Sequence, residues 1–187
     1  MKYGRPLLPA AAALLVANTP AHAHRLDEYL QATVIDVTRQ HVAITVDLTP
    51  GVDVAPGVIR AIDRNGDGVL SPQERQAYAT HVAQGLSLSL DGTPLPLASV
   101  ATAFPPVAAM RAGNGTIRLR AGATLTLTPG AHRLAYTNLG TAPDTVYLVN
   151  ALLPRDPTIH VQRQQRTASQ ASYELDFTVT PPPTDSK

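Results

Sequence analysis

The chain has 187 residues, of which 44% are hydrophobic and 16% are charged, so it is long enough for one ordinary domain with a hydrophobic core. Its formal charge is only +1 and it has no dense basic run, which argues against a nucleic-acid-binding protein. The absence of cysteine excludes disulfides, iron–sulfur clusters, thiolate zinc sites and cysteine nucleophiles. Seventeen prolines, 4% aromatic residues and no tryptophan favour short strands and turns.

Residues 1–23 have the pattern of a signal peptide rather than of a folded segment. Lys2 and Arg5 form a basic start, residues 7–16 form an apolar run, and an Ala-x-Ala cleavage signal ends the segment. The apolar run is too short to span a bilayer. Cleavage would leave His24 at the mature N-terminus. Because no second hydrophobic span follows, we expect a soluble periplasmic or secreted protein with no membrane span.

The mature chain begins with two predicted strands, residues 30–37 and 41–48. Hydrophobic residues occupy every second position of the second strand, which is typical of a strand with one buried face. The short link between the two strands predicts a hairpin. Pro50 and Gly51 then end the second strand.

An acidic, glycine-containing stretch, residues 63–74, follows with the sequence Asp-Arg-Asn-Gly-Asp-Gly-Val-Leu-Ser-Pro-Gln-Glu. Its spacing fits the twelve-residue calcium loop of the EF-hand family, because oxygen donors stand at positions 1, 3, 5, 9 and 12 and Gly68 stands at the sharp turn of position 6. Calcium takes six to eight oxygen ligands, so the loop must wrap around the ion. The predicted Ca²⁺ ligands are Asp63, Asn65, Asp67, Val69 through its carbonyl, Ser71 and Glu74.

The residues beside this loop predict a helix on each side. Val58, Ile59 and Ile62 have the spacing of one helix face before the loop. After it, Ser71 and Glu74 form a capping box with proline at the first helical position. The alternative is a polar Asx-turn that is rich in Asp, Asn and Gly but binds no metal.

Further strand patterns separated by turn signals follow the helices, as expected for a β-sandwich. They lie at residues 86–90, 116–120, 124–128, 133–138, 145–149, 158–164 and 172–179. An Asp91–Gly92 turn follows the first of them. Residues 98–115 are irregular, with a short strand expected near Val100, and residues 181–187 form a polar tail expected to be disordered. The fold predicted for residues 24–180 is therefore mainly β, an antiparallel β-sandwich with a helix-loop-helix inserted at 50–85.

Residues 50–85 resemble the EF-hand family, and this resemblance implies calcium binding. EF-hands usually work in pairs and this chain has a single one, so we expect Leu70, at loop position 8, to pack against the sandwich instead of a partner loop. Residues 23–31 and 148–157 are similar to an exported bacterial domain that sometimes precedes the membrane helices of nickel/cobalt-transporter-like proteins. Those membrane helices are absent here, so transport does not follow from the similarity.

Two functions other than calcium binding come into question. A mature N-terminal His24 has both amine and imidazole nitrogens, so with a second histidine it could bind copper or nickel in a transition-metal accessory protein. The candidates for that second histidine are His41, His81, His132 and His160. The sequence contains no recognisable catalytic motif, so we do not expect an enzyme. It identifies no protein partner, although an unknown one remains compatible with the composition.

Overall fold

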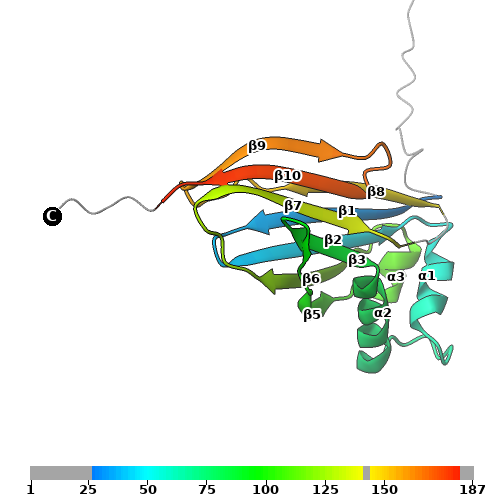
Figure 1. Cartoon of the computed structure of the whole chain (residues 1–187). Helices are drawn as coiled ribbons and strands as arrows, with labels where there is room; N and C mark the ends of the chain where they lie inside the picture. The colour runs from blue at the N-terminus through cyan, green and yellow to red at the C-terminus, as the bar shows by residue number, and fades with distance from the viewer. Residues whose placement is uncertain (1–26, 141–143, 182–187) are drawn as a thin grey trace, which may run out of the picture.

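The computed structural model describes residues 27–140 and 144–181, except for the side chains of residues 99 and 100. The predicted signal peptide, His24 and residues 182–187 of the tail lie outside the described residues. The described part is mainly β-structure in two five-stranded sheets, drawn as two layers in Figure 1. The helices gather at one end of these layers.

The first sheet has the strand order β5-β6-β2-β1-β8. Its strands are β1 (Tyr29–Val37), β2 (His41–Pro50), β5 (Ala98–Ala103), β6 (Ile117–Thr124) and β8 (Thr145–Ala151). β1 and β2 form the predicted hairpin, with Ile35 opposite Ile44. β1 also pairs with β8, and this pair is parallel, so the expectation of an entirely antiparallel fold is wrong here. Alternation in a sequence shows which side chains are buried, but not the direction of a neighbouring strand that is distant in the chain.

The second sheet has the strand order β4-β3-β7-β10-β9, and every pair in it is antiparallel. Its strands are β3 (Leu86–Leu90), β4 (Thr93–Pro94), β7 (Gly130–Asn138), β9 (Ile159–Arg166) and β10 (Ser172–Val179). β3 and β4 are joined by the predicted turn, in which Asp91 and Gly92 have φ angles of 51° and 80°. Two successive positive φ angles are those of the tight turn that suits the twist of a hairpin.

Inward-facing side chains of both sheets form one hydrophobic core. Alternate residues are buried in β2 (Val42, Ile44, Val46 and Leu48) and in β10 (Tyr173, Leu175, Phe177 and Val179). A buried polar contact also joins the sheets, because the hydroxyl of Thr33 in β1 lies 2.9 Å from the hydroxyl of Tyr136 in β7. The predicted alternation of buried and solvent-facing residues is thus present in both layers.

Two helices lie between β2 and β3: α1 (Ala55–Ile62) and α2 (Pro72–Gln84). The predicted apolar face of α1 is buried in the common core. α2 begins with the predicted capping box: the Ser71 hydroxyl accepts the backbone N–H of Glu74, while the Glu74 carboxylate accepts the backbone N–H of Ser71. Pro72 stands in the first turn, where its missing N–H costs no hydrogen bond. Local sequence signals therefore determine where α2 begins.

The short strand expected near Val100 is confirmed as β5. The short helix that follows it, α3 (Val107–Arg111), was not predicted. Gly115 lets the chain return closely past α3, since a Cβ at this position would lie 2.6 Å from the backbone nitrogen of Met110. Met110 is fully buried, so this excursion belongs to the core.

The strand predicted at 116–120 is β6, which continues to Thr124, whereas the strand predicted at 124–128 is wrong because residues 125–128 belong to no strand. The partner of β6, β2, begins at His41, which lies opposite Thr124, so no strand remains for the following residues to pair with. Leu125 and Leu127 instead donate backbone hydrogen bonds of 3.0 Å to the carbonyls of Gln40 and Arg39 in the turn before β2. Leu125 and Leu127 are buried and the residue between them is not, although no partner strand pairs with this segment. This alternation is the pattern from which the sequence predicted a strand.

Candidate functional site

The segment from Asp63 to Ser71 joins α1 to α2 and is folded by hydrogen bonds to its own backbone. The two Asp63 oxygens accept the N–H groups of Gly66 and Gly68 at 2.8 and 2.9 Å. Asn65 Oδ1 accepts the N–H of Asp67 at 3.0 Å, and Asp67 Oδ1 accepts the N–H of Val69 at 2.8 Å. Side chains at loop positions 1, 3 and 5 are therefore held in successive Asx-type turns. This arrangement keeps three predicted ligand side chains folded over the loop.

Glu74, at position 12, joins the two ends of the loop. Its Oε1 accepts the backbone N–H of Arg64 at 2.9 Å, and its Oε2 accepts the backbone N–H and the hydroxyl of Ser71 at 3.0 and 2.8 Å. The hydrogen bonds from Ser71, with those from Arg64 and Asn65, lower the pKa of Glu74 below its ordinary value. The side chain is therefore a carboxylate at neutral pH, which is the form a cation requires.

Two glycines permit the tight course of this loop. Gly68 has a φ of 79°, as expected for the sharp turn at position 6, and Gly66 has a φ of 72°. Both angles lie in the left-handed region, where a side chain is strained. The sequence did not predict that residue 66 would also need a positive φ angle, although it is a glycine.

Adjacent residues at positions 7 and 8 have opposite surroundings. The side chain of Val69 is 64% exposed and apolar, so only its backbone carbonyl could be a ligand. Leu70 is only 3% exposed and belongs to the core cluster formed with both sheets. Leu70 is therefore buried, as expected for a lone hand, and that it packs against the β-layers stays a prediction.

The predicted ligands are neighbours, but their carboxylates do not converge on one point. Besides the turns above, Asn65 Nδ2 donates to Asp67 Oδ2 at 2.9 Å, and Ser71 Oγ contacts Glu74. Over residues 27–140 and 144–181, no three His, Asp or Glu side chains are grouped as they would be around a metal ion. The donor set of the loop nevertheless consists of carboxylate, amide, hydroxyl and carbonyl oxygens, which suits a hard cation such as Ca²⁺.

Within residues 27–140 and 144–181, none of the histidines considered for a transition metal belongs to a group of three possible metal ligands. His24 lies outside the described residues. His132 already has two acceptors, since Nδ1 lies 2.8 Å from Asp91 Oδ2 and Nε2 lies 2.8 Å from the carbonyl oxygen of Thr128. Burial alone would lower the pKa of His132, but the hydrogen bonds to Thr128 and Asp91 outweigh it and raise the pKa above the ordinary 6.5. Two acceptors favour the imidazolium, in which both ring nitrogens donate.

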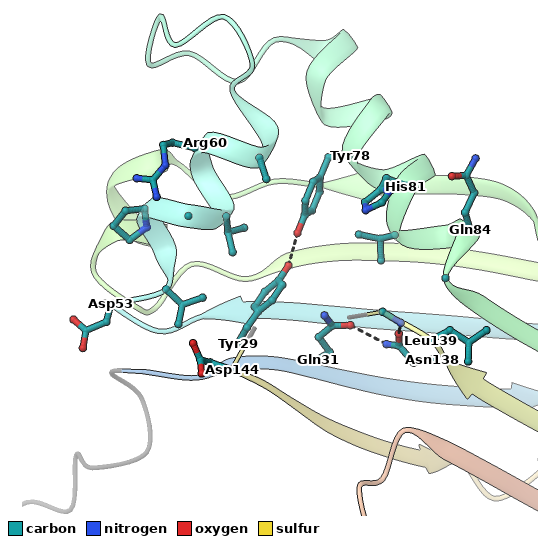
Figure 2. A pocket seen from close by; sticks show the side chains of 18 of the residues that line it. Tyr29, Gln31, Asp53, Arg60, Tyr78, His81, Gln84, Asn138, Leu139 and Asp144 are labelled. Atoms are coloured by element: carbon teal, nitrogen blue, oxygen red, sulfur yellow. Dashed lines mark hydrogen bonds between the residues drawn. The ribbon is translucent and has the colours of Figure 1, made fainter. Parts of the chain in front are cut away.

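Sequence reasoning missed a cleft beside α1 and α2 (Figure 2). Its floor contains Tyr29, Gln31, Tyr78 and Asn138, which come from β1, α2 and β7. Tyr78 follows Glu74 by one helical turn, so the loop and the cleft share α2. The only sequence signal for the cleft was the presence of polar residues such as Gln31 and Asn138 within strands. In the sequence these residues cannot be distinguished from ordinary solvent-facing positions.

Comparisons of the chain with known protein families, with curated proteins and with solved structures gave no significant match. None of the helices in the described part of the chain has the length and hydropathy that crossing a bilayer would need.

Proposed function

We propose that this protein is an exported β-sandwich that binds Ca²⁺ through a single EF-hand, residues 63–74, and that the ion stabilises the fold. The observation that carries this proposal is the folding of Asp63, Asn65 and Asp67 over their own loop by hydrogen bonds of 2.8–3.0 Å. These turns hold the three side chains close to the loop, and on binding an ion their oxygens would turn from the backbone N–H groups onto one common point. Val69 would add its carbonyl, Ser71 its hydroxyl and Glu74 its carboxylate.

The hydrogen bonds of Glu74 support a modest affinity. Calcium must compete with the N–H of Arg64 and the cap at Ser71 for the oxygens of this carboxylate. The loop has only the three acidic ligands Asp63, Asp67 and Glu74, and no second hand supports it. We therefore expect a dissociation constant on the order of 10⁻⁴–10⁻³ M, the range of extracellular calcium modules. Such a value suits an exported protein, because free calcium is abundant outside the cell.

A stabilising role is favoured over a switch because both ends of the loop are anchored. α1 contributes four buried residues to the core, and Leu70 is buried beside them. Opening the two helices, as a sensor hand does, would expose these side chains to water. Calcium binding to the folded state instead stabilises it by mass action, by about 2.7 kcal/mol at a hundredfold excess over the dissociation constant.

Thermal melts test this role. Wild type and Glu74→Gln are melted in calcium, in magnesium and in chelator, together with a dye that binds exposed hydrophobic surface. We expect calcium to raise the melting temperature of wild type by several degrees without dye binding, and to leave Glu74→Gln nearly unchanged. Glutamine also satisfies a capping box, so this variant retains the start of α2. A melting temperature that is the same in calcium and in chelator would contradict the proposal.

A further inference from the structure

The cleft has a volume of about 1160 Å³ and lies between α1 and α2 on one side and the ends of β1 and β7 on the other (Figure 2). Binding clefts for small ligands usually measure about 300–1,000 Å³, so this one has room for a ligand of that size or larger. Such sites combine apolar walls with a few convergent polar groups. Both features are present here.

The polar floor has a donor that lacks a partner among the described residues. The backbone N–H of Gly140 donates to Asn138 Oδ1 at 2.9 Å, which identifies the other amide atom of Asn138 as its nitrogen. That nitrogen donates to Gln31 Oε1 at 2.8 Å, so the remaining amide atom of Gln31 is also a nitrogen. In Figure 2 this nitrogen points away from Asn138 and into the cleft. Gln31 is only 5% exposed, so a largely buried carboxamide presents its N–H₂ group to a ligand in the cleft.

A second donor lies beside the first. The hydroxyls of Tyr29 and Tyr78 are 2.6 Å apart, and only one of their two hydrogens can lie between the oxygens. The other hydrogen is left for a further acceptor. Burial raises the pKa of both phenols, most strongly that of Tyr29, so both stay neutral donors at physiological pH. The phenols and the carboxamide of the floor are therefore uncharged hydrogen-bond donors, which suit a ligand with neutral acceptor atoms.

The residues that carry two of these donors, Tyr29 and Gln31, follow the repeat of an extended chain. Tyr29 and Gln31 are two residues apart on β1, and both are buried on the same face of the strand. Positions two apart on a strand are separated by about 6.6–6.8 Å, which is also the repeat of carbonyl groups that point to one side of an extended peptide. An extended peptide can therefore place successive same-side carbonyls over the tyrosine pair and over Gln31.

The walls suit the side chains of such a peptide. Apolar surface comes from Val54, Pro56, Val58, Val82 and Leu139. Charged groups in the lining are Asp27, Asp53, Asp144, Arg60 and Arg64, whose formal sum is −1. Figure 2 shows Asp53 and Asp144 near the same end of the cleft. This balance favours a neutral or basic peptide over an acidic one.

We propose that this cleft binds an extended peptide segment with alternating apolar side chains and a basic residue at the end that faces Asp53 and Asp144. The proposal is independent of calcium binding. It goes beyond the calcium function because it gives the exported domain a second ligand.

A random heptapeptide display library, selected on the immobilised protein, tests the proposal. The best peptide is then synthesised with a fluorophore, and its affinity for each variant is measured by anisotropy. Gln31→Glu keeps the acceptor for Asn138 but replaces the donor with an oxygen that repels a carbonyl. We expect it to bind about tenfold more weakly or worse, the ratio that corresponds to a hydrogen bond of about 1.4 kcal/mol.

Leu139→Ser is the second variant, because Leu139 is exposed and its replacement leaves the core intact even if Gln31→Glu folds poorly. Leu153→Ser is its matched control, an exposed leucine outside the cleft. Weaker binding by both cleft variants, or by Leu139→Ser alone if Gln31→Glu does not fold, supports the proposal when Leu153→Ser binds as wild type does. A selection that enriches no peptide overturns it, as does equal affinity of Leu139→Ser and Leu153→Ser, or enrichment of acidic peptides.

Discussion

Replacing Leu70 by alanine tests whether the loop is anchored in the hydrophobic core. Leu70 is 3% exposed, whereas its neighbour Val69 is 64% exposed. Removing the buried side chain loses its transfer free energy and leaves a cavity, so Leu70→Ala should lower the free energy of unfolding by about 2–5 kcal/mol. In a chain of this size, each kcal/mol lowers the melting temperature by about 2–4 °C. The melting temperature should therefore fall by about 4–20 °C.

Val69→Ala is the matched control, because it also shortens an aliphatic side chain but does so in solvent. Its effect should stay within about 0.5 kcal/mol. Both variants are unfolded by heat and by urea in the presence of chelator, so that calcium does not contribute to the difference. Equal stabilities of Leu70→Ala and Val69→Ala would refute the idea that the loop is anchored through position 8.

Three further predictions concern other parts of the molecule. Glu74→Gln should weaken calcium binding more than Asn65→Ala, because only Glu74 can supply two oxygens and its charge is lost; equal affinities would show that the ligand register is wrong. Tyr29→Phe leaves the Tyr78 hydroxyl without its partner and should cost about 1–3 kcal/mol in urea unfolding, whereas replacing both tyrosines should cost less than the sum of the two single changes. Because the pKa of His132 is raised in the folded state, its stabilising contribution is complete below about pH 6.5 and is lost as the pH rises through the folded pKa; His132→Gln should lack this loss, and identical pH profiles would contradict it.

Much of the fold is predictable from local patterns. Strand patterns in the sequence identified β1, β2, β3, β7, β8, β9 and β10 to within a few residues, most clearly where alternate residues are buried, as in β1, β2 and β10. The start of α2 was predicted from Ser71 and Glu74, whose side chains satisfy the free N–H groups of a helix end. These signals depend on residues close together in the chain, so they can be recognised without the tertiary structure.

The features that were missed depend on distant residues. The parallel pairing of β1 with β8 brings Thr33 opposite Val149, and no local pattern encodes that register. β6 ends at Thr124 because β2 begins at His41, which is a property of the partner strand. The cleft also depends on distant residues, because the orientation of the Gln31 carboxamide is fixed by a hydrogen bond from Asn138, which lies in the other sheet.

Isothermal calorimetry of calcium with the purified protein tests the calcium proposal most directly. We expect one ion per chain with a dissociation constant on the order of 10⁻⁴–10⁻³ M. Glu74→Gln, measured in the same buffer, should show a much weaker heat of binding at the same calcium concentrations. No heat from wild type at millimolar calcium, or the same heat from Glu74→Gln as from wild type, would contradict calcium binding by residues 63–74.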